Sequence, residues 1–207
     1  MNDAIYDHQF IFIPWTSAIS HSAASIEATE RIATKRGLAI TVAVQTLQYV
    51  PDVLSRAAKV TERSGHVKPG GVVLAYYPTY RLMSKIDHLW RSVVVLAEWH
   101  QDDHSGWAKS VGAYNVTSGV VMSDGLNEEG NAAIEALLFA GYKGWHDSMA
   151  IAQANRALNE LLASGGYDRQ VVLFRARKAR GERGIEKIHS ILDNFERDHQ
   201  IAADRER

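Results

Sequence analysis

Four short apolar runs in the first half of the chain constrain its fold more than any other feature of the sequence. They occupy residues 9–13, 38–44, 72–77 and 92–97. Runs of Val and Leu without polar alternation are typical of strands buried on both faces, as in a parallel sheet covered by helices. Each run is followed by a segment with helical spacing or a helix-start signal. The sequence therefore predicts an α/β fold, with a mostly parallel sheet of about five strands flanked by helices.

Two of the segments around these runs carry specific expectations. Pro51 is expected to open a helix, because its missing N–H costs nothing in the first turn. The residues 114–116 and 120–122 are expected to form the fifth strand, interrupted at 117–119. The apolar stripe of the helix that begins at Pro51 comprises Val50, Val53, Leu54, Ala57 and Val60.

The character of the sequence changes after residue 123, where helical patterns replace the strand runs. Residues 171–174 suit either a strand or a buried helix, and Asp168 as a helix cap favours the helix. The patterns continue almost to the end of the chain, which predicts a helical C-terminal part. We expect an α/β sandwich domain over 1–123, a helical C-terminal subdomain over 124–200 and a flexible tail over 201–207.

Composition excludes several classes of protein. Lys and Arg number 23 against 24 Asp and Glu, so no overall charge draws the chain to nucleic acid or to an anionic membrane. Cys is absent, which excludes disulfides, thiolate zinc sites, iron–sulfur clusters and thiol catalysis. The N-terminus does not resemble a secretory signal, and no apolar run approaches the roughly 20 residues of a membrane span. We therefore expect a cytoplasmic protein that does not associate with membranes.

The densest polar cluster of the chain, residues 98–104, directly follows the fourth apolar run. In open α/β sheets, ligands gather beyond the carboxyl ends of the strands. Glu98 is suited to act as a general base, and two histidines four residues apart suit metal ligands on a helix. The alternative is an ordinary capped loop. The candidate catalytic residues are Glu98, His100, Asp103 and His104, and the candidate ligands of a divalent metal are His100, Asp102 and His104.

Two other strand ends carry candidate ligand-binding residues. Thr16 and Ser17 precede an expected helix, whose first N–H groups are suited to hold an anion, although helix capping by neighbouring serines is the plainer interpretation. Tyr77 and Arg81 follow the third apolar run and are suited to stack on a ring or to hold a phosphate, although such tyrosines often only pack. The chain lacks the glycine-rich phosphate-binding motifs and the Gly-x-Ser-x-Gly motif.

A basic cluster near the C-terminus is the third candidate. Residues 169–187 contain seven Lys and Arg against two Glu, a local charge of +5. Lys and Arg that neutralise phosphates are the main source of affinity for nucleic acid. A solvated helix face, or docking on the acidic segment 124–167, would explain the same charges. The candidate nucleic-acid-binding residues are Arg175, Arg177, Lys178, Arg180 and Arg183.

The segment Gly70-Gly71-Val72-Val73-Leu74-Ala75-Tyr76-Tyr77-Pro78-Thr79-Tyr80-Arg81-Leu82-Met83-Ser84-Lys85-Ile86 resembles a strand–helix unit in the second motor domain of some helicases. It covers under a tenth of the chain. The nucleotide-binding loop and arginine-finger motifs of that family have no counterpart here, so the resemblance implies no activity.

Three functions remain open from the sequence. The first is a binding or regulatory protein whose ligand is phosphate-bearing or a nucleic acid. The second is a metal-dependent hydrolase-type enzyme with its site after the fourth strand. The third is a protein–protein assembly module, including a homo-oligomer, with aromatic anchors. The candidate anchors are Trp15, Trp99, Trp107 and Trp145.

Overall fold

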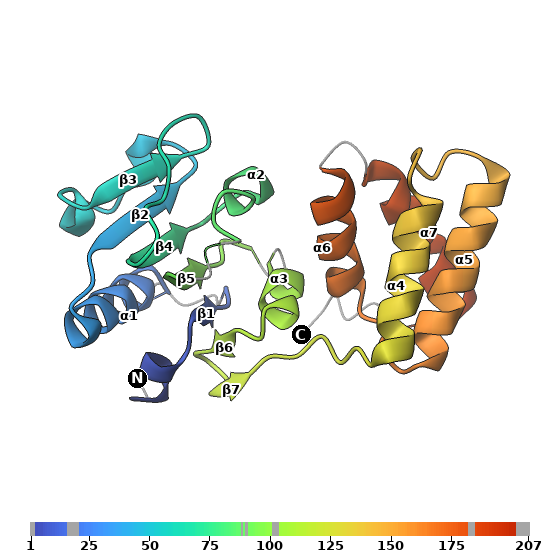
Figure 1. Ribbon diagram of the computed structural model, residues 1–207, viewed down its shortest axis with the longest axis horizontal. Coiled ribbons are helices and arrows are strands. Elements are labelled where there is room, and N and C mark those ends of the chain that lie inside the picture. The colour runs from blue at the N-terminus through green and yellow to red at the C-terminus, as the bar shows by residue number, and fades with distance from the viewer. Residues whose placement is uncertain are drawn as a thin grey trace. The chain divides into compact units, whose positions relative to one another are not determined.

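The computed structural model describes residues 3–15, 21–87, 89, 91–100, 104–181 and 185–201. The chain divides into two compact units, Met1–Ser123 and Asp124–Arg207 (Figure 1). The predicted fold class is confirmed: a mostly parallel seven-stranded sheet is flanked by helices, and the C-terminal part is helical. No helix within the described residues is long and apolar enough to span a membrane.

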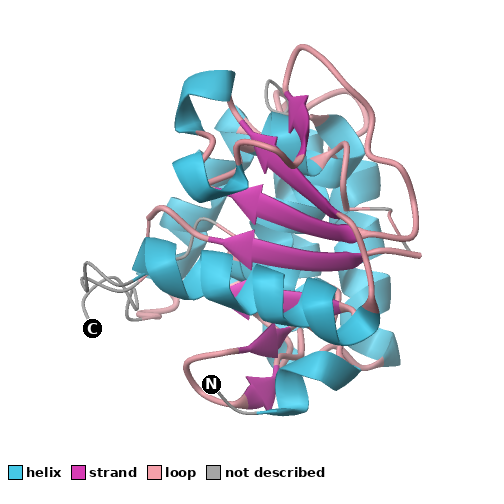
Figure 2. Ribbon diagram, turned by 90° about the vertical axis from the view of Figure 1, so that its left-hand side faces the viewer, coloured by secondary structure: helices cyan, strands magenta, loops and turns pink. Residues whose placement is uncertain are grey.

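The first unit is built on one sheet, with the strand order β3-β2-β4-β5-β1-β6-β7. All neighbouring strands are parallel except β6 and β7. Figure 2 shows the central strands side by side and pointing the same way. The strands are β1 Phe10–Ile13, β2 Ile40–Val44, β3 Ala58–Thr61, β4 Val72–Tyr76, β5 Val93–Ala97, β6 Tyr114–Asn115 and β7 Val120–Val121. The helices are η1 Asp3–Asp7, α1 His21–Arg36, η2 Leu47–Tyr49, η3 Asp52–Leu54, α2 Tyr80–Met83 and α3 Ser105–Ser110.

The two central strands β4 and β5 are buried on both faces, as their unbroken apolar runs predict. Helix α1 covers one face, where Ala28 and Ile32 pack in the cluster that holds Val72, Leu74 and Val95. Helix α3 lies on the opposite face, where the Trp107 ring meets the edge of the Phe10 ring at 5.9 Å between centroids. The helices that follow the neighbouring strands β1 and β5, α1 and α3, therefore lie on opposite faces of the sheet.

The prediction of a helix that begins at Pro51 is wrong. That segment forms only the short 3-10 helix η3 and then β3, which pairs in parallel with β2. The spacing of Leu54, Ala57 and Val60 suits a helix, but the free edge of β2 supplies the hydrogen-bond partners that make residues 58–61 a strand.

The interrupted fifth strand is in fact a hairpin. Strands β6 and β7 run antiparallel, with Tyr114 opposite Val121 and Asn115 opposite Val120. The Asn115 side chain accepts hydrogen bonds from the N–H groups of Thr117 and Ser118, at 2.9 and 3.1 Å, and so closes the turn between the strands.

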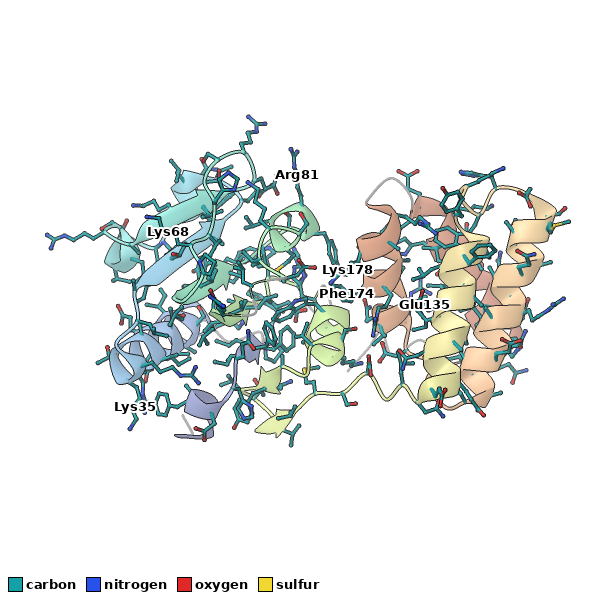
Figure 3. All side chains as sticks on the ribbon, viewed as in Figure 1. Lys35, Lys68, Arg81, Glu135, Phe174 and Lys178 are labelled. Carbon is teal, nitrogen blue, oxygen red and sulfur yellow. The ribbon has the colours of Figure 1, made fainter. Side chains whose placement is uncertain are left out.

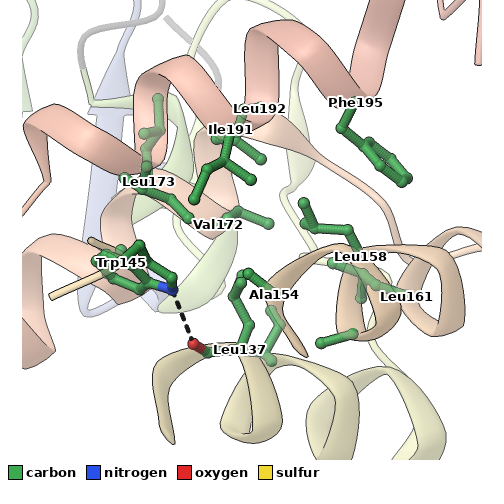
Figure 4. Close-up of a cluster of buried hydrophobic side chains, with 14 of the residues drawn as sticks. Leu137, Trp145, Ala154, Leu158, Leu161, Val172, Leu173, Ile191, Leu192 and Phe195 are labelled. Atoms are coloured by element: carbon green, nitrogen blue, oxygen red, sulfur yellow. Dashed lines mark hydrogen bonds between the residues drawn. The ribbon is translucent and has the colours of Figure 1, made fainter. Parts of the chain in front are cut away.

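The second unit consists of α4 Glu128–Ala140, α5 Ser148–Ala163, α6 Arg169–Arg180 and α7 Glu186–Asp198. The ambiguous segment around residue 172 is helical, and Asp168 caps α6 by accepting from the N–H groups of Gln170 and Val171. The buried faces of these helices form a core of their own (Figure 4). Trp145 is fully buried in that core, and its indole N–H donates to the carbonyl oxygen of Leu137 at 3.3 Å.

Gly71 is required just before β4, because a side chain there would collide with the backbone of Ala39, just before β2. An added Cβ would lie 2.7 Å from the carbonyl oxygen of Ala39. The same carbonyl accepts from the N–H of Val72 at 2.9 Å. We expect Gly71→Ala to lower the free energy of unfolding by about 2–3 kcal/mol, as overpacking against backbone does. Urea unfolding followed by circular dichroism measures the loss.

Gly37→Ala is the matched control for this prediction. An added Cβ at Gly37 meets no atom within 4 Å, although the backbone φ there is +64°. Its loss should therefore be limited to about 1 kcal/mol from the left-handed backbone. Equal losses in the two variants would show that the contact with Ala39 has no effect.

Candidate functional site

Three neighbouring strands end level at one edge of the sheet. In the order β4-β5-β1, Tyr76 pairs with Ala97, and Ala97 pairs with Ile13. The connection after β1 leads through α1 to β2, whereas the connection after β5 leads through α3 to β6 on the other side of β1. Such a point, where neighbouring connections diverge, is where open α/β sheets bind ligands. We call the side chains gathered there the carboxyl rim: Trp15, His21, Tyr76, Tyr77, Tyr80, Glu98, Trp99, His100 and His104.

Glu98 joins two of the loops at the carboxyl rim. Its side chain is 1% exposed. One carboxylate oxygen accepts from the N–H of Trp15 at 3.1 Å, and the other accepts from the N–H of His104 at 2.8 Å. Hydrogen bonds from backbone N–H groups to a buried carboxylate are charge-assisted and strong. Glu98 therefore fixes the loop after β1 against the loop after β5.

His104 joins a third loop to the same edge. Its Nε2 lies 2.7 Å from the carbonyl oxygen of Pro78, just after β4. Because a carbonyl only accepts, Nε2 carries the proton and donates. The ring also packs on the Tyr80 ring, with 4.9 Å between centroids. The loops that follow β1, β4 and β5 are thus held together through Glu98 and His104.

Four rings of the carboxyl rim make a closed circuit of contacts. The Trp15 ring contacts the Trp99 ring at 5.3 Å, and the Trp99 ring contacts the Tyr77 ring at 4.7 Å. The Tyr77 ring contacts the His21 ring at 5.9 Å, and the His21 ring closes the circuit to Trp15 at 5.4 Å. His21 is only 4% exposed, whereas Trp99 is 48% exposed. Trp99 is therefore a half-exposed ring that packs on the Trp15 and Tyr77 rings, and both of these contact the buried His21 ring.

Tyr77 has an unusual backbone at this edge. Its φ is +52°, a left-handed conformation that residues other than glycine rarely adopt. Its N–H donates to the carbonyl of Ala97 at 3.0 Å. Burial raises the pKa of the Tyr77 phenol, and the neighbouring Tyr76 adds to the rise. The phenol is therefore neutral at physiological pH and does not repel an anion. Strained residues of this kind cluster at functional sites.

His21 is the first residue of α1 and forms the buried part of the ring circuit. Its Nε2 lies 3.1 Å from the carbonyl oxygen of Ile13, so Nε2 donates. The buried Nδ1 has no hydrogen-bond partner among the described residues. The next residue, Ser22, hydrogen-bonds through its hydroxyl to the hydroxyl of Tyr76. The N-terminal end of α1 therefore opens at the carboxyl rim.

The structure brings together some of the predicted site residues. Glu98, His104 and Tyr77 lie together, and His100 is exposed beside the Trp99 ring at 5.9 Å. Both oxygens of Glu98 bind backbone N–H groups, so its role as a base stays a prediction. Arg81 is exposed on α2. Four of the residues predicted for this edge lie outside the described part of the chain: Thr16, Ser17, Asp102 and Asp103.

The predicted metal site depends on such a residue. Among the residues that the structure describes, no three His, Asp or Glu side chains are placed to hold a metal ion. The ligand set of His100, Asp102 and His104 includes one undescribed member. The metal centre therefore stays a prediction.

The predicted nucleic-acid-binding residues are largely engaged within the second unit. Arg175 pairs with Asp124 at 3.3 Å. Arg180 donates to the carbonyl oxygens of Leu138 and Gly141, at the end of α4. Lys178 lies over the Phe174 ring at 6.0 Å (Figure 3). Arg177 also has an interaction, and Arg183 is outside the described residues. Several of the basic side chains that the sequence predicted to bind phosphates are therefore already in contact with groups of the protein itself.

The ring circuit was not predicted from the sequence, although a shared spacing of its members points to it. Trp15, Tyr77 and Trp99 each lie one or two residues beyond the end of a strand. That shared offset is the signal that points to one edge of the sheet. Trp15 and Trp99 were noted only as candidate anchors of an assembly. The other two candidate anchors, Trp107 and Trp145, are core residues that are 1% and 0% exposed.

Comparison with known proteins adds no assignment to this geometry. No family model matches the chain, and no curated protein or solved structure matches it.

Proposed function

We propose that the first unit binds a small ligand of the nucleotide class at the carboxyl rim, as a binding or regulatory protein. The observation that carries the proposal is the circuit of Trp15, Trp99, Tyr77 and His21 at the point where the connections of β1 and β5 diverge. A half-exposed tryptophan whose neighbours hold it in place is a preorganised surface for stacking a flat base.

The phosphate of such a ligand fits the same edge. Helix α1 begins at His21, and the N-terminal N–H groups of a helix attract anions. The phenol of Tyr77 near this end of α1 is neutral at physiological pH, because burial raises its pKa. Among the described residues of the carboxyl rim, the only carboxylate is that of Glu98, which is buried on backbone N–H groups. The edge therefore offers a ring to a base and partial positive charge to a phosphate.

Trp99→Ala tests the proposal. Binding of adenosine and guanosine 5′-monophosphates is measured by calorimetry and by tryptophan fluorescence. Stacking of a base on an aromatic ring contributes about 1–3 kcal/mol, so we expect a loss of affinity of about 5- to 150-fold. Adenosine should bind more weakly than its monophosphate, because it makes no use of the α1 N-terminus.

Tyr142→Ala is the control variant, because Tyr142 is 72% exposed and belongs to the second unit. It should bind both nucleotides as the unaltered protein does. Absence of saturable nucleotide binding by the unaltered protein, or an unchanged affinity in Trp99→Ala, would reject the proposed function.

A further inference from the structure

The outer edge of the sheet is a second surface with unmatched positive charge. It is built by η2, η3, β3 and the link from β3 to β4, which together occupy the edge position of the sheet. We call it the β3 surface; its exposed basic and aromatic residues are Tyr49, Arg56, Lys59, Arg63 and Lys68, and the acid Asp52 is exposed on it as well. The residues 45–71 contain four Lys and Arg against two acids, Asp52 and Glu62.

The cations of the β3 surface are available to a ligand. Arg56, Arg63 and Lys68 are exposed, and within the described part of the chain none of the three forms an ion pair. Figure 3 labels Lys68 on this link. In α6, in contrast, Arg169, Arg175 and Arg180 have carboxylate or carbonyl partners within the second unit. Among the described residues, the β3 surface therefore holds exposed cations without an ion pair, whereas several cations of the basic cluster are engaged.

A tight turn presents Arg63 to solvent. The N–H of Thr61 donates to the carbonyl oxygen of Ser64 at 2.9 Å, and the N–H of Ser64 donates to the Thr61 hydroxyl at 3.1 Å. Within this turn, the Glu62 carboxylate accepts a hydrogen bond from the Thr79 hydroxyl. Glu62 is thereby hydrogen-bonded to the capping residue of α2, whereas its neighbour Arg63 stays exposed.

Apolar side chains accompany these cations. Leu47 is 59% exposed, Tyr49 is 50% exposed and Val53 is 69% exposed. Lys59 donates to the carbonyl oxygens of Ser55 and Ala57, at 2.5 and 3.2 Å, which orders its side chain and leaves it exposed. A polyanion with exposed flat bases matches both features, because phosphates pair with the cations and a base stacks on the Tyr49 ring.

The elements of this surface favour a single strand over a duplex. Reading of duplex DNA usually places a helix or a two-stranded ribbon in the major groove. The β3 surface presents instead two three-residue 3-10 helices and one four-residue strand. We propose that the β3 surface binds single-stranded nucleic acid, with its phosphates on Arg56, Lys59, Arg63 and Lys68 and a base on Tyr49. The residues of this site are different from those of the carboxyl rim.

The test measures binding of a fluorescein-labelled oligothymidylate of about 20 nucleotides by anisotropy, between about 50 and 200 mM salt. The variant Arg56→Glu/Arg63→Glu/Lys68→Glu removes three phosphate contacts. Each contact to a single strand contributes about 0.7 to the slope of log affinity against log salt, so we expect the slope to fall by about 2. Tyr49→Ala should lower affinity about 5- to 150-fold and leave the slope unchanged.

The control variant Lys143→Glu/Arg156→Glu/Lys178→Glu makes the same change in net charge on the second unit. All three residues are exposed, and Lys178 belongs to the basic cluster. It should keep the affinity and slope of the unaltered protein. Circular dichroism confirms that the variants are folded. The proposal is overturned if the unaltered protein does not bind the oligonucleotide, or if the control variant loses as much affinity as the β3 variant. Tighter binding of a duplex of the same length would also overturn it.

Discussion

Replacement of Trp145 by alanine is expected to lower the free energy of unfolding of the helical unit by about 3–5 kcal/mol. The indole is completely buried and lies among the side chains that α4, α5, α6 and α7 contribute to one core (Figure 4). Its N–H also donates to the carbonyl oxygen of Leu137 near the end of α4. The ring fits so closely that an added Cβ at Gly141 would lie 2.2 Å from two of its atoms. Truncation therefore leaves a cavity that its neighbours cannot easily fill.

Urea unfolding followed by far-ultraviolet circular dichroism measures this loss without depending on tryptophan fluorescence. Phe139→Ala is the matched control, because Phe139 is an aromatic residue of α4 that is 78% exposed. Its effect should stay within about 0.5 kcal/mol, as for most surface substitutions. If both variants lost the same small amount, Trp145 would not be an anchor of this core.

Glu98→Ala has the second large expected effect, a loss of about 2–5 kcal/mol from the first unit. The substitution leaves the N–H groups of Trp15 and His104 without their acceptor, and each unsatisfied buried donor costs about 1–3 kcal/mol. It also separates the loops after β1 and β5, which hold Trp15 and Trp99 together. We therefore expect nucleotide binding at the carboxyl rim to be lost and tryptophan fluorescence to change.

Glu135→Ala is the control, because Glu135 is exposed on α4. Its stability should match that of the unaltered protein within about 0.5 kcal/mol. The stability of Glu98→Gln should fall between those of Glu98→Ala and Glu135→Ala. The amide oxygen still accepts from one backbone N–H, but the NH₂ group is turned toward the other N–H. A Glu98→Ala variant as stable as Glu135→Ala would show that Glu98 does not hold the loops.

The central strands were predictable because an unbroken run of apolar residues in each segment indicates burial on both faces of the sheet. Val72 to Tyr76 and Val93 to Ala97 have no polar alternation, and both lie in the middle of the sheet. Strand β3 was not predictable in this way. Two of its four residues are exposed and two are buried. Their strand conformation depends on pairing with β2, which the spacing of apolar residues within the segment does not reveal.

The place of the candidate site could be predicted, whereas the roles of its residues could not. Parallel strands deliver their ends to one edge, so Tyr77 and Glu98 had to lie close together. The acceptor role of Glu98 depends on N–H groups of the backbone, which no side-chain pattern reveals. The same holds for the basic cluster, since the sequence counts Arg175 and Arg180 as charges but does not show the Asp124 and carbonyl partners that occupy them.

The open edge of β3 has a consequence for how copies of the chain meet one another. An edge strand exposes unpaired N–H and C=O groups that a strand of another molecule can join, which is the first step of sheet-to-sheet aggregation. The link from β2 brings no long helix to this edge, and Lys59 lies on the strand with Arg56 and Arg63 close by in the chain. Like charges on two approaching edges repel, so we expect these side chains to oppose edge-to-edge pairing of two copies of the chain.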